Sequence, residues 1–332
     1  MLQEQGKLNV QESITKYFPE YTAAEKVTIE DLLTMRSGIS EHQEGLEKGE
    51  YSLSVNASEA ENQQAILNWI YNKDLEFVAG TRFKYSNTNY LLLSMIVEKV
   101  TEQSYKDFLV ENIFTPLGMK NTGFYEELLN DPELAENTVN SNGPIDPELK
   151  GLTQGCGDLV SNAKDIDKWL TALGEHTLIS EESFKQMTTN YSLNVGYGYG
   201  VYLTQYGGIF HDGAIVSYNC GALVCPKDKF NVFTVSNEID FEKIHMVELA
   251  LQLADVINND GIHGDVNCDG RVNIKDATKI QKYIAQLVTL TESQMAFADV
   301  TMSGKVDIND VTAIQEYIAN ITTRHPIGNP MH

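Results

Sequence analysis

The sequence predicts an α+β fold, with an antiparallel sheet flanked by helices, followed by a small all-α module. Helix signals dominate the first half of the chain, strand-like runs gather between residues 195 and 236, and a gapless repeat occupies residues 264–321. Helices first and strands late are typical of an antiparallel sheet with helices packed on it. The 332 residues are 42% hydrophobic and 9% aromatic, which excludes a disordered acidic chain and allows about two domains.

Capping signals and apolar periodicity locate the helices. Thr28 with Asp31 forms a capping-box-like start for one of them, and either Ser161 or Asn162 caps a later one. The segment 258–261, Asn-Asn-Asp-Gly, breaks the last helix before the repeat. The predicted helices cover residues 29–35, 62–71, 88–100, 161–173 and 241–259.

The strand-like runs are apolar and are separated by turn-forming residues. A glycine-rich segment at 196–200 lies in the first run, and His211-Asp212-Gly213 ends the second. The predicted strands cover residues 195–204, 208–211, 216–225 and 230–236.

The charge balance restricts the partners. The chain carries 24 basic and 47 acidic side chains, for a net charge of −23. A field of that sign repels phosphates, so nucleic acid and anionic membranes are poor partners. No stretch has the apolar length needed to span a bilayer. Small neutral substrates, cations and proteins remain.

The four cysteines carry no metal signal. Cys156, Cys220, Cys225 and Cys268 include no CxxC pair and have no histidine cluster near them, so a thiolate site is not predicted. Cys220 and Cys225 lie five apart in a predicted strand, so their side chains point to opposite faces and cannot bridge to each other. We interpret all four as small buried hydrophobic residues. They leave the redox compartment undecided.

The first residues, Met1 to Leu8, read as the end of a helix that Gly6 stops, and they do not resemble a secretory leader. We therefore expect an element of the fold to be missing before Met1.

The repeat carries a metal-binding pattern. Residues 265–287 align to residues 299–321, with 12 of 23 positions identical at an offset of 34. Each copy begins with the oxygen-donor spacing of a twelve-residue calcium loop, including a backbone carbonyl at position seven and a glycine for the sharp turn at position six. Two Ca²⁺ sites are predicted, the second weaker because Thr301 and Ser303 replace acidic or amide ligands. The predicted ligands are Asp265, Asn267, Asp269, Arg271, Asn273 and Asp276 in the first loop, and Asp299, Thr301, Ser303, Lys305, Asp307 and Asp310 in the second.

At these residues the segment 264–321 resembles a type I dockerin. The resemblance implies that calcium is needed for folding, that the partner is a cohesin module of a scaffoldin, and that the protein is extracellular and associated with a cellulosome. It places the partner-reading positions on Ile274 and Lys275, and on Ile308 and Asn309. The Ser-Thr pair common in one dockerin group is absent, which leaves the cohesin class open.

Four short strings in the larger domain are hard to explain by packing alone: residues 32–39, 79–87, 116–119 and 211–213. Their letters are Leu-Leu-Thr-Met-Arg-Ser-Gly-Ile, Ala-Gly-Thr-Arg-Phe-Lys-Tyr-Ser-Asn, Pro-Leu-Gly-Met and His-Asp-Gly. In this order they resemble the serine beta-lactamase and penicillin-binding-protein superfamily, especially its class C-like esterases and peptidases. The resemblance implies a beta-lactamase/transpeptidase-like fold, incomplete at the N-terminus.

In that superfamily acyl transfer runs through a serine ester. The serine needs a base, a lysine or a tyrosine whose pKa is lowered by surrounding positive charge. The resemblance makes Tyr85 that tyrosine and Asn87 the residue that hydrogen-bonds the acyl side chain. It puts His211 where relatives carry a lysine or histidine. Gly213 lets substrate approach the strand edge, and the Ala214 N–H supplies half of the oxyanion hole. No cofactor is implied for catalysis.

The family's nucleophile lies in a Ser-x-x-Lys motif on the helix whose end resembles Met1 to Leu8. Ser161-Asn162-Ala163-Lys164 matches the letters, but it begins a helix after Gly155-Cys156-Gly157, where relatives have a structural glycine-rich turn. The chain is therefore predicted to lack its nucleophile and to be inactive.

Three accounts stay open. The first is a fragment of a secreted, dockerin-bearing serine hydrolase that acts on a small ester, lactam or peptide. The second is a catalytically dead module kept for docking. The third, an enzyme of polysaccharide catabolism, requires paired carboxylates that the sequence does not support. We place the hydrolase domain at residues 1–258, a linker at 259–263, the dockerin at 264–321 and a tail at 322–332.

Overall fold

The computed structural model describes residues 1–128, 130–136, 149–192, 194–204, 207–215, 217–226, 229–237, 245–258, 262–321 and 325–328. The chain divides into two compact units, Met1–Glu248 and Leu249–His332. Among the described residues, no helix has both the length and the apolar character needed to cross a membrane.

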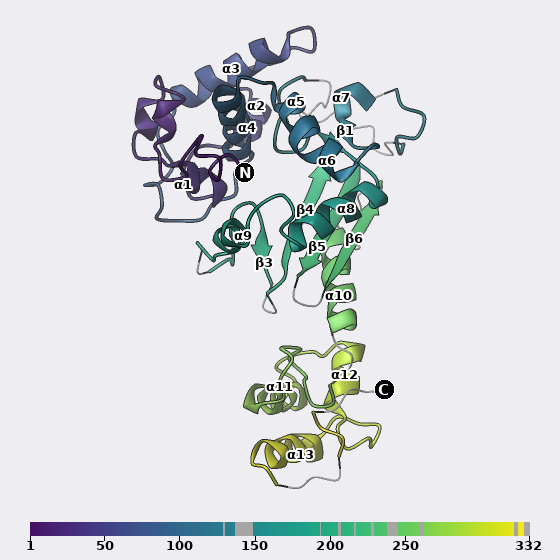
Figure 1. Ribbon diagram of the computed structural model, residues 1–332. Coiled ribbons are helices and arrows are strands. Elements are labelled where there is room, and N and C mark those ends of the chain that lie inside the picture. The colour runs from purple at the N-terminus through teal and green to yellow at the C-terminus, as the bar shows by residue number, and fades with distance from the viewer. Residues whose placement is uncertain are drawn as a thin grey trace. The chain divides into compact units, whose positions relative to one another are not determined.

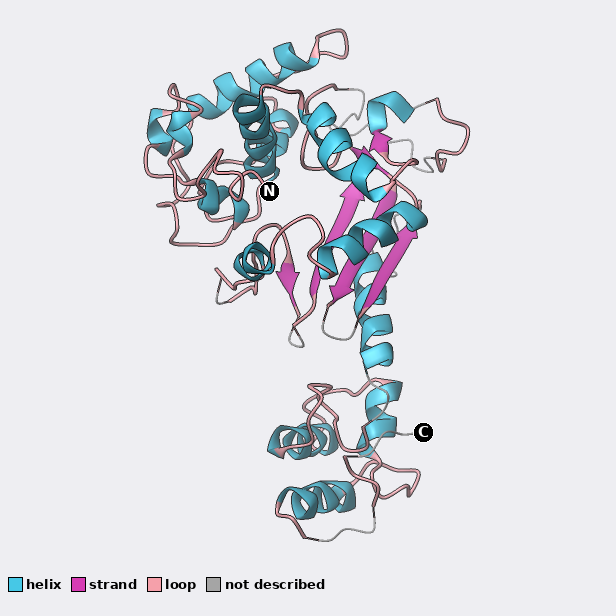
Figure 2. Cartoon of the chain, viewed as in Figure 1, coloured by secondary structure: helices cyan, strands magenta, loops and turns pink. Residues whose placement is uncertain are grey.

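The first unit combines helices with an antiparallel sheet, which confirms the predicted fold class (Figures 1 and 2). The main sheet has the order β3-β4-β5-β6, and a short pair β1-β2 lies apart from it. The strands are β1 Gly123–Phe124, β2 Leu159–Val160, β3 Tyr202–Leu203, β4 Ile209–Ile215, β5 Tyr218–Cys225 and β6 Phe230–Ser236. The helices are η1 Ile14–Lys16, η2 Thr22–Ala24, α1 Ile29–Leu33, α2 His42–Glu47, α3 Glu59–Tyr71, α4 Asn87–Thr101, α5 Tyr105–Leu109, the π-helical segment η3 Val110–Phe114, α6 Thr115–Leu117, α7 Tyr125–Leu128, α8 Ala163–Gly174, α9 Glu181–Met187 and α10 Met246–Asn258.

Local capping explains several of these helix starts. Thr28 and Asp31 form a complete capping box at α1, as predicted. Of the two candidate caps for α8, Asn162 is the one used, and its side chain accepts the N–H of Asp165. The predicted helix over 241–259 is confirmed as α10 from Met246, while residues 241–244 and 259 lie outside the described residues.

Two predicted strands differ from the structure. Over residues 195–204 only Tyr202–Leu203 forms a strand, because Gly196 and Gly200 take a positive φ of 71° and turn the chain. The second strand, predicted to end at the His211–Gly213 motif, continues to Ile215. Position 216 lies outside the described residues, so the next strand is described from Tyr218.

The main sheet is covered on both faces. Helix α8 lies on one face (Figure 2), and its Leu170 belongs to the same buried apolar cluster as Val224 of β5. Gly221 lies an odd number of residues from Val224 and so points to the other face. A Cβ on Gly221 would lie 2.4 Å from the Cα of Val247, at the start of α10. Glycine at this position therefore permits α10 to approach the strand closely.

Helices η1, η2, α1, α3 and α4 contribute to a separate apolar core. Helix α4 contacts both α1 and α2, and the 13-residue α3 contributes buried isoleucines. This helical core positions the loop that precedes α4. Its buried members are Val10, Ile14, Phe18, Tyr21, Ala24, Val27, Ile29, Leu32, Ile39, Ile66, Ile70, Leu91, Leu92, Met95, Ile96 and Leu152.

Residues 1–7 form a single helical turn that Gly6 ends, as predicted. Gly6 has a φ of 68°, and its N–H donates to the carbonyl of Gln3 at 2.9 Å. The N–H of Lys7 donates to the carbonyl of Leu2 at 3.0 Å. These two bonds define a Schellman motif.

An apolar cavity of about 380 Å³ lies beside this turn. Polar groups at its wall have partners within the protein: Tyr90 Oη donates to the Leu33 carbonyl at 3.0 Å, and Gln3 Nε2 to Gln186 Oε1 at 2.9 Å. Side chains that face such space lack van der Waals partners on one side, so the packing here is weaker than in a filled core. The apolar lining includes Leu8, Val10, Ile29, Leu93, Ile96, Val97, Phe108, Ile179 and Met187.

The second unit is helical outside its loops. Its helices are α11 Ile274–Ile284, α12 Glu292–Ala298 and α13 Ile308–Ile318, and α11 contacts α13. Each repeat helix starts in a capping box, Asn273 with Asp276 and Asp307 with Asp310. The buried core consists of Val266, Ala277, Ile280, Ala298, Val300, Val311, Ala313, Ile314 and Ile327.

Ile327 joins this core from the segment that the sequence analysis places in the tail. It is 5% exposed, and a Cβ on Gly264 would lie 3.0 Å from its Cγ2. The N–H of Gly328 donates to the carbonyl of His263 at 2.8 Å. The segment that precedes the first repeat loop is therefore held against the segment that follows α13.

We predict that Ile327→Ala destabilises the second unit by about 2–4 kcal/mol, because it leaves a cavity in a small core. Differential scanning calorimetry of the full chain with calcium present measures this as a lower midpoint for that unit. Leu287 is 74% exposed. Leu287→Ala is therefore the matched control and should stay within about 0.5 kcal/mol. Equal effects of the two substitutions would contradict the packing role.

Candidate functional site

The structure brings Tyr85 and His211 together from distant parts of the first unit. Tyr85 precedes α4 and His211 lies on β4, and their ring centroids are 6.1 Å apart. Tyr197 Oη lies 3.4 Å from His211 Nε2, and the ring of Tyr202 lies 5.6 Å from the imidazole. His211 thus stands among three tyrosines. The sequence analysis missed Tyr197 and Tyr202, since a glycine-rich strand offered no sign that they face a histidine.

A buried polar network holds the start of α4. Ser37 Oγ donates to Asn89 Oδ1 at 2.5 Å. The backbone N–H of His42 donates to Thr88 Oγ1 at 2.8 Å, and the two ring nitrogens of His42 contact Thr88 Oγ1 and the Leu152 carbonyl. His42 is 0% exposed, so it is a core residue whose polar groups have partners.

Asn87 is the first residue of α4, and its neighbours come from the start of α2. Its side-chain Nδ2 donates to Gln43 Oε1 at 3.4 Å. Its backbone N–H donates to the carboxylate of Glu41, which also accepts the N–H of Gln43 at 3.0 Å. Glu41 therefore caps two helices beside Tyr85. The sequence analysis did not single out Glu41, because nothing local shows where its side chain points.

The edge of β4 is open at the predicted oxyanion position. Strand β3 pairs only with Ile209 and Phe210, so the described strands leave the edge from His211 to Ile215 unpaired. Gly213 and Ala214 lie on this edge, and Ala214 is exposed. A Cβ on Gly213 would lie 2.8 Å from the Sγ of Cys220 on the paired strand. Packing against Cys220 is thus a second reason for glycine here.

The protonation of Tyr85 differs from what the resemblance requires. Burial, with smaller effects that include Asp212 and Glu41, raises the pKa of the Tyr85 phenol above its ordinary value. A base for serine would need a lowered pKa. In this structure Tyr85 is therefore a proton donor at neutral pH.

The sequence contains two Ser-x-x-Lys strings, and the serine of each hydrogen-bonds to groups other than Tyr85. Ser161 Oγ lies 2.7 Å from Thr122 Oγ1. The second string begins at Ser13, which the sequence analysis did not weigh and which caps the short η1. Ser13 Oγ donates to the Glu25 carbonyl at 2.7 Å, and Lys16 pairs with Glu12 at 2.8 Å. Both serines act as structural caps or cross-links.

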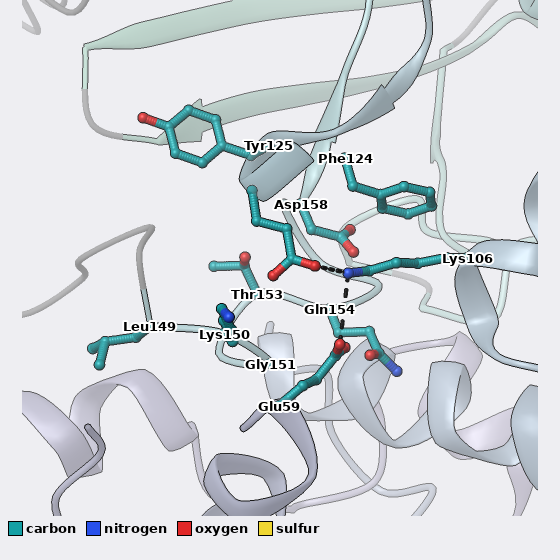
Figure 3. Close-up of a pocket in the computed structure, with 11 residues that line it drawn as sticks. Glu59, Lys106, Phe124, Tyr125, Leu149, Lys150, Gly151, Thr153, Gln154 and Asp158 are labelled. Atoms are coloured by element: carbon teal, nitrogen blue, oxygen red, sulfur yellow. Dashed lines mark hydrogen bonds and ion pairs between the residues drawn. The ribbon is translucent and has the colours of Figure 1, made fainter. Parts of the chain in front are cut away.

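A small charged pocket of about 30 Å³ lies by the Gly155–Asp158 turn. Lys106 points into it toward Glu59, with Asp158 beside them (Figure 3). Lys106 Nζ lies 3.5 Å from Glu59 Oε2 and pairs more closely with Glu126. Burial raises the pKa of Asp158 to about 6. The pocket is too small for a substrate, so its charges connect α3, α5 and α7.

All four cysteines are present as thiols rather than disulfides, and two of them, Cys225 and Cys268, are buried. Cys156 and Cys220 are only partly shielded, which corrects the expectation that all four are buried. Cys220 and Cys225 lie on one strand with an odd offset, as predicted.

The first repeat loop has the donors for a cation. The carboxylate of Asp265 accepts the N–H of Gly270 at 2.7 Å, and that of Asp276 accepts the N–H groups of Asn267 and Asn273 at 2.8 and 2.9 Å. Asn267 Oδ1 is buried and has no hydrogen-bond partner among the described residues. Burial raises the pKa of Asp265, and that of Asp276 to about 6. A hard cation would satisfy both the orphaned oxygen and the buried charge.

The second loop has the same shape with weaker donors. Asp299 accepts the N–H of Gly304 at 2.7 Å. Thr301 Oγ1 donates to Asp310 at 2.8 Å, and Ser303 Oγ lies within 3.3 Å of Asp299. These hydroxyls are engaged with the neighbouring carboxylates, which agrees with a weaker second site.

The other predicted ligands lie in the same loops. The described residues contain no group of three or more His, Cys, Asp or Glu side chains placed to hold a metal. Amide, hydroxyl and carbonyl oxygens must therefore complete either site. These further positions are Asp269, Arg271, Asn273, Lys305 and Asp307.

The predicted partner-reading residues occupy equivalent places at the starts of the two repeat helices. Ile274 is 56% exposed at the start of α11, and Ile308 is 58% exposed at the start of α13. Lys275 and Asn309 are exposed beside them. An exposed isoleucine next to a polar side chain is a surface suited to a protein partner.

Comparison with known proteins identifies matches for both units. The family described as Beta-lactamase matches residues 1–253, and the Dockerin type I domain matches residues 263–319.

Among curated proteins, the chain is 28% identical over 225 residues to the Bacillus subtilis protein named penicillin-binding protein PbpX, covering 66% of this chain and 53% of that protein. It is 25% identical over 182 residues to the teichoic acid D-alanine hydrolase of Staphylococcus aureus, covering 54% of this chain and 43% of that protein. The chain thus spans about half the length of these curated relatives.

Among solved structures, the penicillin-binding protein homologue from Pyrococcus abyssi superposes with a TM-score of 0.61 at 27% identity, over 76% of this chain and 62% of that chain. The D-amino acid amidase from Ochrobactrum anthropi superposes with a TM-score of 0.60 at 24% identity, over 78% and 79%. The second likeness shows the fold alone.

We predict that Asp158→Asn makes the first unit more stable at pH 7.5 and flattens its pH dependence. The raised pKa of Asp158, about 6, means that the folded protein binds this proton more tightly than the unfolded chain, in which aspartate titrates near 3.9. Protonation therefore contributes stability that is fully present below about pH 4 and is lost as the pH rises through about 6. Urea unfolding at several pH values should show a gain on the order of 1–2 kcal/mol at pH 7.5.

Asp167 is exposed on α8, so Asp167→Asn is the control and should leave the profile unchanged. An Asp158→Asn profile identical to that of the unsubstituted chain would refute the role of this carboxyl.

Proposed function

The chain belongs to the beta-lactamase family over residues 1–253 and carries a type I dockerin domain at residues 263–319, and from this premise we propose that it is a serine-hydrolase-type module that its dockerin attaches to a cohesin of a scaffoldin. The approach of Tyr85 to His211 beside the open edge of β4, with Asn87 two residues after Tyr85, supports the first half of the proposal. Extracellular, cellulosome-associated location follows from the second half.

The site is arranged for acyl transfer: the described residues supply the binding and proton-donating groups, and an activated nucleophile is not among them. In this assignment the Ala214 N–H stabilises the oxyanion, Gly213 permits close approach of the substrate, and Asn87 hydrogen-bonds the acyl side chain. The Tyr85 phenol, protonated at neutral pH, donates a proton or hydrogen bond to the leaving group. Ester, D-amino-acid peptide or amide, and lactam bonds are the candidate substrates, and the name of one curated relative, teichoic acid D-alanine hydrolase, favours D-aminoacyl compounds.

The 332-residue chain on its own forms no acyl-enzyme in this proposal. The hydroxyls of Ser13 and Ser161 are bonded elsewhere, and Lys16 is paired with Glu12. An activated nucleophile requires a base within hydrogen-bond reach. The site therefore binds acyl compounds without a covalent step, and docking is the function that the chain can perform unaided.

Two calcium ions hold the dockerin in its binding form. The orphaned Asn267 oxygen and the buried Asp265 and Asp276 support the first site, and the matching geometry around Asp299 and Asp310 supports the second. When bound, the ions supply structural charge neutralisation and no chemistry. Ile274 with Lys275, and Ile308 with Asn309, are the proposed cohesin contacts.

The absence of an acyl-enzyme is tested with a serine-acylating fluorophosphonate and, separately, with a penicillin. Intact-mass spectrometry of the treated full chain should show no added mass, because neither serine is activated. A serine hydrolase of known activity is treated in parallel and should gain the mass of the probe. A covalent adduct on any residue of this chain would refute the proposal.

Calcium binding is tested by isothermal titration of the chelator-stripped full chain. We expect two sites of unequal affinity, and Asp265→Ala should remove the tighter one while Asp299→Ala removes the weaker. Circular dichroism should show loss of helix in chelator and its return with calcium. Capture on an immobilised panel of cohesins should depend on calcium. Asp167→Ala is the control, and a single site or calcium-independent capture would contradict the assignment.

A further inference from the structure

The candidate site in the first unit is surrounded by negative charge and aromatic rings. Asp212 neighbours His211, with its Oδ1 3.7 Å from His211 Nδ1, and its side chain is 52% exposed. The rings of Tyr85, Tyr197 and Tyr202 surround the same histidine. Carboxylates and the electron-rich faces of aromatic rings both attract cations.

Glu41 supplies a second carboxylate at the other end of the Tyr85 segment. Its side chain is 10% exposed, and it accepts the backbone N–H of Asn87. Its nearest ionisable neighbour is His42, 3.4 Å away, whose pKa burial lowers, so that this ring is neutral at neutral pH. The negative charge of Glu41 is thus met by helix N–H groups and by no cationic side chain among its described partners.

Nearby basic side chains are held elsewhere. Lys84, which precedes Tyr85, pairs with Glu76 at 2.6 Å. Arg36 donates to the carbonyl of Gly80, and Arg82 lies over the ring of Phe77 at 4.7 Å. Burial is the main cause of the raised pKa of the Tyr85 phenol, and Asp212 and Glu41 are the carboxylates among the groups that raise it further. A substrate carboxylate would meet repulsion from both.

We propose that the Tyr85–His211 site selects acyl compounds that carry an ammonium group, such as aminoacyl esters and amides, and that Glu41 and Asp212 are its specificity-determining residues. This rests on the proposed function, because it takes the site as the one that binds substrate. It also divides the candidate substrates. Aminoacyl amides and esters with a free amine are accepted, while penicillins and peptides that end in a free carboxylate are disfavoured by charge.

The test measures non-covalent binding to the full chain, so it needs no nucleophile. Isothermal titration at pH 6.5 compares D-phenylalanine amide, whose amine is then mostly charged, with its neutral N-acetyl derivative and with anionic N-acetyl-D-phenylalanine. We expect the ammonium compound to bind about tenfold more tightly than the neutral one, the scale of one charge-assisted hydrogen bond. The anionic compound should bind least.

Substitutions test whether Glu41 and Asp212 cause the preference for the ammonium compound. Glu41→Gln and Asp212→Asn should each weaken the binding of the ammonium compound about three- to tenfold and leave the affinity for the neutral compound unchanged. Glu61 caps α3 through a carboxylate much as Glu41 caps α2, but in a capping box with Ser58. Glu61→Gln is therefore the matched control for loss of a capping charge and should change neither affinity.

Equal binding of the charged and neutral compounds, or no larger effect of Glu41→Gln than of Glu61→Gln, would overturn the charge selection. Tyr85→Phe separates this failure from failure of the proposed function. If the substitution weakens both compounds equally, the site binds substrate and only the ammonium preference is wrong. If none of the compounds binds the unsubstituted chain, the preference and the substrate-binding role of the site fail together.

Discussion

Hydrogen bonds between the loop at residues 37–43 and the first turn of α4 position the candidate site in the first unit. The Ser37–Asn89 bond and the contacts of His42 with Thr88 are buried. A buried polar group left without a partner costs about 1–3 kcal/mol, so the loop and the helix are stable only when they are formed together. Tyr85 lies two residues before α4 and takes its place from this pairing. The His42 contact with the Leu152 carbonyl extends the same constraint to the segment before the Gly155–Asp158 turn.

The sequence predicted features that depend on neighbouring residues, such as helix caps. It missed features that depend on contacts between residues far apart in the chain. The predicted capping box at α1 depends on residues three apart, and it is confirmed. The segment 195–204 has a strand-like composition, yet it turns, because Tyr197 is fully buried and a Cβ on Gly200 would lie 2.4 Å from Tyr90 Oη. Glu41 was missed because its partner Asn87 lies 46 residues along the chain. Tyr85 and His211 were found by resemblance, and their 6.1 Å separation required the fold.

The chain has a net negative charge, and some of its lysines are already paired with carboxylates. Lys106 is taken by Glu59 and Glu126, and Lys84 by Glu76. Among the described residues, Asp212 and Glu41 act on the Tyr85 phenol, and both, like burial, raise its pKa. One arrangement therefore has two consequences: Tyr85 keeps its proton, and the surroundings favour a ligand that brings a positive charge.

The carboxylates of the two repeat loops hold the loops closed through hydrogen bonds, and the same carboxylates are the proposed Ca²⁺ ligands. Asp276 closes its loop by accepting two backbone N–H groups and completes the capping box of α11. That arrangement leaves a fully buried carboxyl group whose pKa rises to about 6, next to the unpartnered oxygen of Asn267. In the second loop the Thr301 hydroxyl donates to Asp310, so the equivalent carboxylate already has a hydrogen bond that its counterpart lacks. A cation relieves more unfavourable burial in the first loop than in the second. The weaker second site that we propose therefore rests on the hydrogen bonds within each loop as well as on the number of charged ligands.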